Sequence, residues 1–189
     1  MTRLFATSLL LIASTSILSC SSKNDSPSAV VTDWTAGRGT AACHEWQRAS
    51  CEWAARCNAR DVAQCAAQYQ EIECNSDTTA TNCATSFDAA ACTTLPANCG
   101  MTDLANAAPA IQGCTDFFNA LCARDATCGS PTPTATCVTQ TETASSIDCS
   151  LAIGLSLNFQ DCLTQINTLS CNAAAQPAVC TKSILFPGP

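Results

Sequence analysis

Cysteine spacing is the feature of this sequence that most constrains its fold. The chain has 189 residues and 17 cysteines, sixteen of which fall in two series of eight. Successive cysteines are separated by 7, 5, 7, 8, 8, 8 and 6 residues in residues 43–99, and by 7, 5, 8, 11, 12, 8 and 8 in residues 114–180. Agreement in both order and spacing predicts two copies of one eight-cysteine module.

The cysteines are expected to form disulfides rather than a metal site. Structural zinc sites favour close ligand pairs such as C-x2-C, whereas no two cysteines here have fewer than five residues between them. The chain has one histidine, His44, so a mixed cluster has no second imidazole. Aromatic residues make up only 5% of the chain, and a module this small needs cross-links to support its core. We therefore expect no metal and no cofactor.

Helical periodicity predicts an all-α fold with about three short helices in each module. Cys43, Trp46, Ser50, Trp53 and Cys57 recur every three or four residues, as on one face of a helix. Asp61 is expected to cap a second helix, and residues 82–92 to form a third. In the second copy, Trp46 corresponds to Phe117, and the third helix is expected to begin near Asp161.

A hairpin of two antiparallel helices suggests which cysteines pair. In such a hairpin, two cysteines that face each other lie about equally far from the turn along the chain. The pairs chosen in this way have their midpoints near residues 58–60 in the first copy and near residues 130–132 in the second, where turns are expected. Eight cysteines can pair in 105 ways, and spacing alone does not decide the other pairs. A third helix that runs back along the hairpin suggests these remaining pairs. The hairpin pairs are Cys43–Cys74, Cys51–Cys65, Cys114–Cys149 and Cys122–Cys137; the others are Cys57–Cys92, Cys83–Cys99, Cys128–Cys171 and Cys162–Cys180.

The charge of the chain argues against nucleic-acid binding. The net charge is −7, and each of the two copies, residues 43–99 and residues 114–180, carries −4. Neither copy has enough lysine and arginine to neutralise a phosphate backbone. The acidity is more consistent with a soluble surface protein.

The first residues have the layout of an export signal. Arg3 precedes an apolar run that ends at Ile17-Leu18-Ser19-Cys20. These four residues resemble the lipobox of bacterial lipoproteins, although Leu18 stands where a smaller residue is usual. The resemblance implies cleavage before Cys20 and acylation of this cysteine. An ordinary secretory signal with a chance cysteine is the alternative, and the apolar run is short for a retained membrane helix.

The resemblance extends to sorting and to the type of protein. Ser21, in place of an aspartate, implies transport to the outer membrane in a bacterium with two membranes. A lipobox followed by helical modules rich in Ala and Cys resembles the cysteine-rich lipoproteins of myxobacteria. The membrane, reached through acyl chains such as palmitate at Cys20, is thus the expected partner, beside a protein partner of unknown identity.

Catalysis has little support in the sequence. Nucleophilic catalysis needs a histidine that can act as base, and His44 lies beside Cys43 at a helix start. The carboxylate pairs Glu71 with Glu73 and Glu45 with Glu52 fit solvated helix faces better than an acid–base pair. We therefore expect a protein that is not an enzyme.

The stretch that differs most between the two copies is residues 150–160. Apolar residues alternate there as in a strand, which predicts either a connector packed on the protein or an exposed loop that binds a partner. The candidate partner-binding residues are Leu151, Ile153, Leu155, Leu157 and Phe159. A second exposed segment, residues 129–133, has the proline-rich composition of a linker but would serve as the rigid loop of an enzyme inhibitor.

Together these features predict an anchored surface protein with an interaction or envelope-structural role. A secreted inhibitor on a disulfide scaffold is the alternative, followed by a thiolate metal-binding protein. The expected organisation is a signal peptide (1–19), a lipidated cysteine and flexible tether (20–42), repeat 1 (43–99), a linker (100–113), repeat 2 (114–180) and a C-terminal tail (181–189).

Overall fold

The fold is mostly helical, with two short strands that the all-α prediction did not include. A computed structural model describes residues 32–172 and 176–187. Its helical elements, in chain order, are η1 (Trp34–Ala36), α1 (Ala41–Arg56), α2 (Val62–Tyr69), α3 (Asp77–Ala89), α4 (Met101–Leu104), α5 (Ala107–Thr127), α6 (Thr134–Ser145), η2 (Cys149–Leu151), α7 (Phe159–Thr168) and η3 (Ala178–Cys180). The strands β1 (Gly154–Leu155) and β2 (Ile184–Leu185) pair antiparallel.

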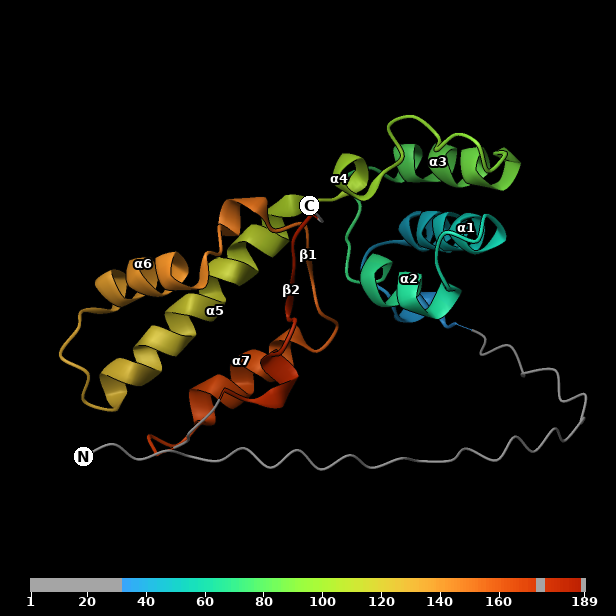
Figure 1. Cartoon of the computed structure of the whole chain (residues 1–189). Helices are drawn as coiled ribbons and strands as arrows, with labels where there is room; N and C mark the ends of the chain where they lie inside the picture. Colours follow the sequence, from blue (N-terminus) through green and yellow to red (C-terminus); the bar gives the residue numbers. More distant parts are fainter. Residues whose placement is uncertain (1–31, 173–175, 188–189) are drawn as a thin grey trace, which may run out of the picture. The chain divides into compact units, whose positions relative to one another are not determined.

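The first half is a three-helix unit with α1 in the middle. Figure 1 shows α1 between α2 and α3, and its buried face contributes Cys43, Trp46 and Cys51. Asp61 caps α2 as expected, since its carboxylate accepts from the backbone N–H groups of Ala63 and Gln64. The polypeptide turns between α1 and α2 at Asn58, whose φ of 54° is tolerated by asparagine.

In the second half, α5 is followed along the chain by α6 and α7. Figure 1 shows α5 beside both α6 and α7, and residues of α5 contact each of them. The turn between α5 and α6 contains Gly129, whose φ of 90° suits glycine. The α5 helix starts at Ala107, seven residues before the expected module start at Cys114. Most of the predicted linker, residues 100–113, is therefore helical.

Two hydrophobic clusters form the core. One gathers Trp46, Ile72, Phe87 and Leu104 from the first half with neighbouring cysteines and alanines. The other is built on α5, β1 and α7. Strand β2 contributes to both, because successive side chains of a strand point to opposite sides: Ile184 packs against the second cluster and Leu185 against the first. Part of the predicted tail, residues 181–189, is thus a structural strand.

The end of the predicted tether is also folded onto the domain. The backbone N–H of Arg38 donates to the carbonyl of Gln70 at 2.8 Å, and the Gln70 side chain donates to the carbonyl of Asp33. The buried amide of Gln47 donates to the carbonyl of Arg38 at 3.1 Å. Hence the part of the tether that the structure describes, residues 32–42, is held to the folded unit from Asp33 onward. Residues 1–31, including the signal peptide and Cys20, lie outside the described residues.

Candidate functional site

Eight disulfides account for all sixteen cysteines of residues 43–180. They join the same eight pairs that the sequence suggested, with Cα–Cα distances from 4.8 Å in Cys162–Cys180 to 5.8 Å in Cys122–Cys137. In each half the first cysteine bonds to the fifth, the second to the fourth, the third to the seventh and the sixth to the eighth. These bonds take up the sulfur atoms that a thiolate metal site would need.

The apolar stretch after Cys149 is largely a packed connector. Ile153, Leu155 and Phe159 are buried, at 7%, 7% and 2% exposure, so they do not form an exposed partner-binding loop. The backbone explains this, because β1 pairs with β2 and thereby turns Leu155 toward α5. Leu151 and Leu157 remain exposed, at 55% and 43%. Of the five candidate partner-binding residues, only these two are free to contact a partner.

Polar contacts hold β1 against the first half. The Arg38 guanidinium donates to the carbonyl of Leu155 at 2.7 Å and to that of Ser156 at 2.8 Å. The N–H of Leu155 donates to the carbonyl of Glu71 at 3.0 Å. Sequence reasoning missed this contact because it assigned Arg38 to the tether.

The Glu71 carboxyl lies half-buried beside this contact. Burial raises its pKa to about 7, and the positive charge of Arg38 opposes part of that rise. Arg38, Glu71 and Glu73 line a space of only about 10 Å³ with Ile153 and Gly154, too small for a substrate. Arg38 and Glu71 therefore take part in the contact between β1 and the first half and do not form a substrate site.

The other titratable candidates are engaged in local contacts. A ring nitrogen of His44 lies 3.0 Å from the carbonyl of Gly37. Glu45 and Glu52 both pair with Arg48, across one turn of α1 on either side. Neither arrangement places an acid–base group in a cavity. Among the described residues, three or more His, Cys, Asp or Glu side chains nowhere gather as a metal site would require.

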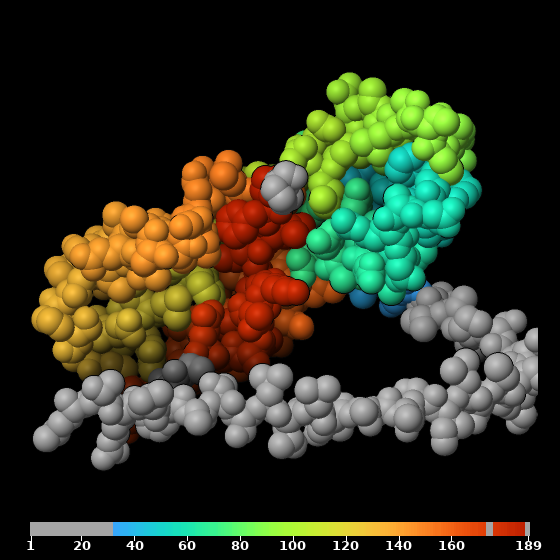
Figure 2. Space-filling model, viewed as in Figure 1, coloured from blue at the N-terminus to red at the C-terminus, as the bar shows by residue number. Residues whose placement is uncertain are grey.

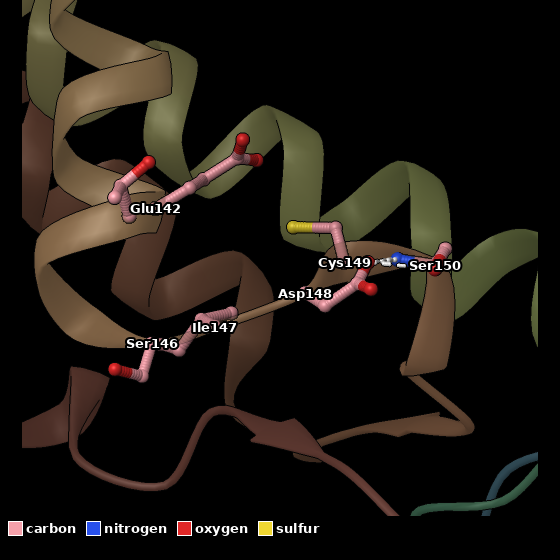
Figure 3. A pocket seen from close by; sticks show the side chains of 7 residues that line it. Glu142, Ser146, Ile147, Asp148, Cys149 and Ser150 are labelled. Carbon is pink, nitrogen blue, oxygen red and sulfur yellow. Dashed lines mark hydrogen bonds between the residues drawn. The ribbon is translucent and has the colours of Figure 1, made fainter.

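An acidic depression lies where α6 runs into η2. Figure 3 shows Glu142, Ser146 and Asp148 around it, with Ser150 hydrogen-bonded to Asp148. The Ser150 side chain and backbone both donate to this carboxylate, at 2.6 and 2.9 Å, and they lower the pKa of Asp148. The Glu142 carboxylate does not point toward Asp148 in Figure 3. The depression is thus a local turn with one satisfied carboxylate.

An apolar groove lies between α5, α6 and the C-terminal strand. Its volume is about 390 Å³, within the ~300–1,000 Å³ of small-molecule pockets. Figure 2 shows the C-terminal residues (red) against the α6 region (orange), where this groove is formed. Its apolar lining comprises Phe117, Phe118, Leu121, Ile147, Ile184 and Phe186. Polar lining residues include Thr141, Ser145, Lys182 and Ser183.

The groove is the candidate functional site of the described residues, and the sequence did not reveal it. Its lining joins residues of α5 and α6 to residues near the C-terminus that are distant in sequence, and β2 had been assigned to the C-terminal tail. The available signal was a difference in side-chain size between the copies, since the first copy has Trp46 where the second has Phe117.

Known proteins give no further guide to this site. No protein-family model, curated protein or solved structure matches the chain. Within the described residues, none of the helices has both the length and the apolar character that a membrane span requires.

Proposed function

We propose that the protein is a non-enzymatic, exported and lipid-anchored component of a bacterial cell envelope, with a binding or structural role. The observation that carries the proposal is the set of eight disulfides, which engages every cysteine of residues 43–180. So many disulfides suggest an oxidising compartment outside the cytoplasm. Cross-links in this number also suit a protein that must persist without a large core.

Two tandem copies of one module are the second part of the proposal. The common order of bonds in the two halves supports it, as does the correspondence of α1, α2 and α3 with α5, α6 and α7 in sequence order. A duplication would give each half its own stapled helical hairpin. The departures, residues 150–160 and the C-terminal strand, are then additions specific to the second copy.

Anchoring rests on the sequence around Cys20. The lipobox resemblance and Ser21 support acylation of Cys20 and transport to an outer membrane. Two or more acyl chains on one residue would hold the protein to the lipid surface without a membrane-spanning helix. Residues 21–31 would then separate the lipid from the folded domain.

A non-catalytic role is supported by how the polar residues are used. His44, Glu45 and Glu52 are engaged in local contacts at the surface of the first half, and the groove of the second half is lined mainly by apolar side chains. The lining of this groove holds no histidine and no carboxylate that could act as a general acid or base. Of the alternatives, an inhibitor would present residues 129–133, which form the turn between α5 and α6.

Intact mass spectrometry tests the proposal on protein purified from a bacterium that processes lipoproteins. We expect a chain that begins at Cys20, carries acyl groups and has no titratable thiol under non-reducing conditions. The control is Cys20→Ser, which should leave an unacylated protein with the same eight disulfides. A mature wild-type protein with an unmodified Cys20 would refute anchoring, and free thiols with bound metal would refute the disulfide scaffold.

A further inference from the structure

The two halves differ at the position of the groove. In the first half, the rings of Trp46 and Tyr69 lie 5.2 Å apart, and the Trp46 indole donates to the carbonyl of Cys99 at 3.1 Å. Trp46 has no exposed surface, so this region of the first half is filled by the protein's own side chains. The side chains of Trp46 and Tyr69 therefore fill this part of the first half.

Smaller side chains stand at the matching positions of the second half. Trp46 is three residues after the first cysteine of its series, and Phe117 is three residues after Cys114. Tyr69 is four residues after Cys65, and the residue four after Cys137 is Thr141. Both Phe117 and Thr141 line the groove, and the Thr141 hydroxyl is used by its own helix. On the duplication proposed above, the groove lies where an aromatic pair fills the first half.

The groove also has a distinctive charge. Its lining contains no carboxylate and one cation, Lys182, although the chain as a whole carries −7. Lys182 is exposed and makes no ion pair within residues 32–172 and 176–187. An exposed lysine beside apolar walls in an acidic protein favours a ligand that is apolar at one end and anionic at the other.

The backbone on both sides of the groove is fixed in an uncommon conformation. Four non-glycine residues of the described part have positive φ, and two of them are asparagines, which tolerate it. The others are Ser146, between two lining residues, and Lys182 itself, with φ of 55° and 60°. Ser146 is the C-cap of α6, a position where the left-handed conformation is common, so its φ reflects the end of that helix.

From these observations we propose that the groove between α5, α6 and β2 binds a small amphipathic anion of the fatty-acid type. The acyl chain would lie on the side chains of Phe117, Leu121 and Phe186, and the carboxylate would face Lys182. Binding is a specific form of the non-catalytic role proposed above. It does not require the lipid at Cys20, because no residue of the groove precedes Phe117.

Equilibrium binding to the mature wild-type chain tests this proposal with two probes of equal chain length. Dodecanoate carries the anionic group and dodecanol lacks it, and each is measured by displacement of the fluorescent apolar anion 1-anilinonaphthalene-8-sulfonate. We expect dodecanoate to bind several-fold more tightly than dodecanol. Equal affinities, or no displacement by either probe, would overturn the proposal without affecting the mass test of Cys20 acylation.

Two variants locate the site. Thr141→Tyr restores the larger side chain of the first half and should weaken both probes at least roughly tenfold by filling the groove. The matched control is Thr139→Tyr, which adds the same bulk on the exposed face of α6 and should change neither affinity. Unchanged binding to Thr141→Tyr would place the probes elsewhere and refute the groove.

Lys182→Asn separates charge from shape, because asparagine keeps the left-handed backbone but removes the cation. Dodecanoate affinity should fall about threefold, within the roughly 1.4- to fivefold range of an exposed ion pair, and dodecanol affinity should stay the same. This variant keeps the test decisive if Thr141→Tyr fails to fold. Equal effects on both probes, or none on dodecanoate, would refute the role of Lys182.

Discussion

Adding one methyl group at Gly113 should destabilise the protein, although alanine is the better helix former. Gly113 is buried inside α5, where a Cβ atom would lie 2.7, 2.8 and 3.3 Å from Cδ1, Cδ2 and Cγ of Leu155. Because the branch carbon is among these atoms, rotating the leucine methyl groups does not relieve the overlap. The buried Leu155 side chain must move as a whole.

Two opposing contributions decide whether Gly113→Ala stabilises or destabilises the protein. Glycine to alanine inside a helix contributes about 1 kcal/mol of stability, whereas overpacking a core typically costs about 1–3 kcal/mol. We expect Gly113→Ala to lower the free energy of unfolding by about 1 kcal/mol. In a Leu155→Ala background the overlap is gone, so the same change should raise it by about 1 kcal/mol.

Guanidinium chloride unfolding, followed by circular dichroism with the disulfides intact, measures all four members of this cycle. Ala123→Gly, at an exposed position of the same helix, gives the local helix-propensity term as a control. A coupling near zero between Gly113 and Leu155 would refute the packing, as would a Gly113→Ala protein more stable than the wild type. Either result would restore the exposed-loop hypothesis for Leu155.

Three further predictions concern the first half and its contact with β1. Arg38→Met removes both hydrogen bonds to the carbonyls of Leu155 and Ser156 and should lower the free energy of unfolding by about 2 kcal/mol in the same assay; a loss no larger than that of a surface substitution would contradict the contact. Glu71 has a native pKa of about 7, above its ordinary value of 4.5, so the native state binds the extra proton and stability falls as the pH rises from about 4.5 to 7. Allowing for solvent screening, the loss is roughly 1–2 kcal/mol, and Glu71→Gln should flatten this part of the profile measured by urea unfolding. Asp61→Ala should cost about 1 kcal/mol by removing the cap of α2, and a thermal midpoint equal to that of the wild type would show that the cap is not needed.

The local features of the fold were predictable because they depend on spacing along the chain. The periodic spacing of apolar residues predicted the helices on either side of the turn near Asn58. The position of Asp61 before an apolar run predicted the cap of α2. The eight cysteine pairs also agree with the structure, since two antiparallel helices bring particular positions to one level.

The contacts that sequence reasoning missed join segments far apart in the chain. Arg38 bonds to Leu155, 117 residues away, and β2 pairs with β1 across 30 residues. Residues 150–160 alternate as in a strand, but β1 and β2 have only two residues each, and the sequence does not show that they pair. The groove depends on the same β2 strand, so it was equally hidden. The signal available in the sequence was the smaller Phe117 at the position that corresponds to Trp46.

The order of the disulfides has a consequence for how the protein matures. No bond joins cysteines that are neighbours in sequence: the partner of Cys43 is Cys74, with Cys51, Cys57 and Cys65 between them. A chain exported from its N-terminus would expose Cys43 and Cys51 to an oxidant before Cys74 had crossed the membrane. The first bond formed would then be wrong, and correcting it requires thiolate attack and exchange, on a timescale of seconds to hours.

Each half can nevertheless correct its bonds alone, because all eight bonds stay within residues 43–99 or residues 114–180. The search is confined to the 105 arrangements of eight cysteines in each half. The yield of native protein should therefore depend on a disulfide isomerase in the receiving compartment, and supplying more oxidant without that activity should trap the chain in scrambled forms.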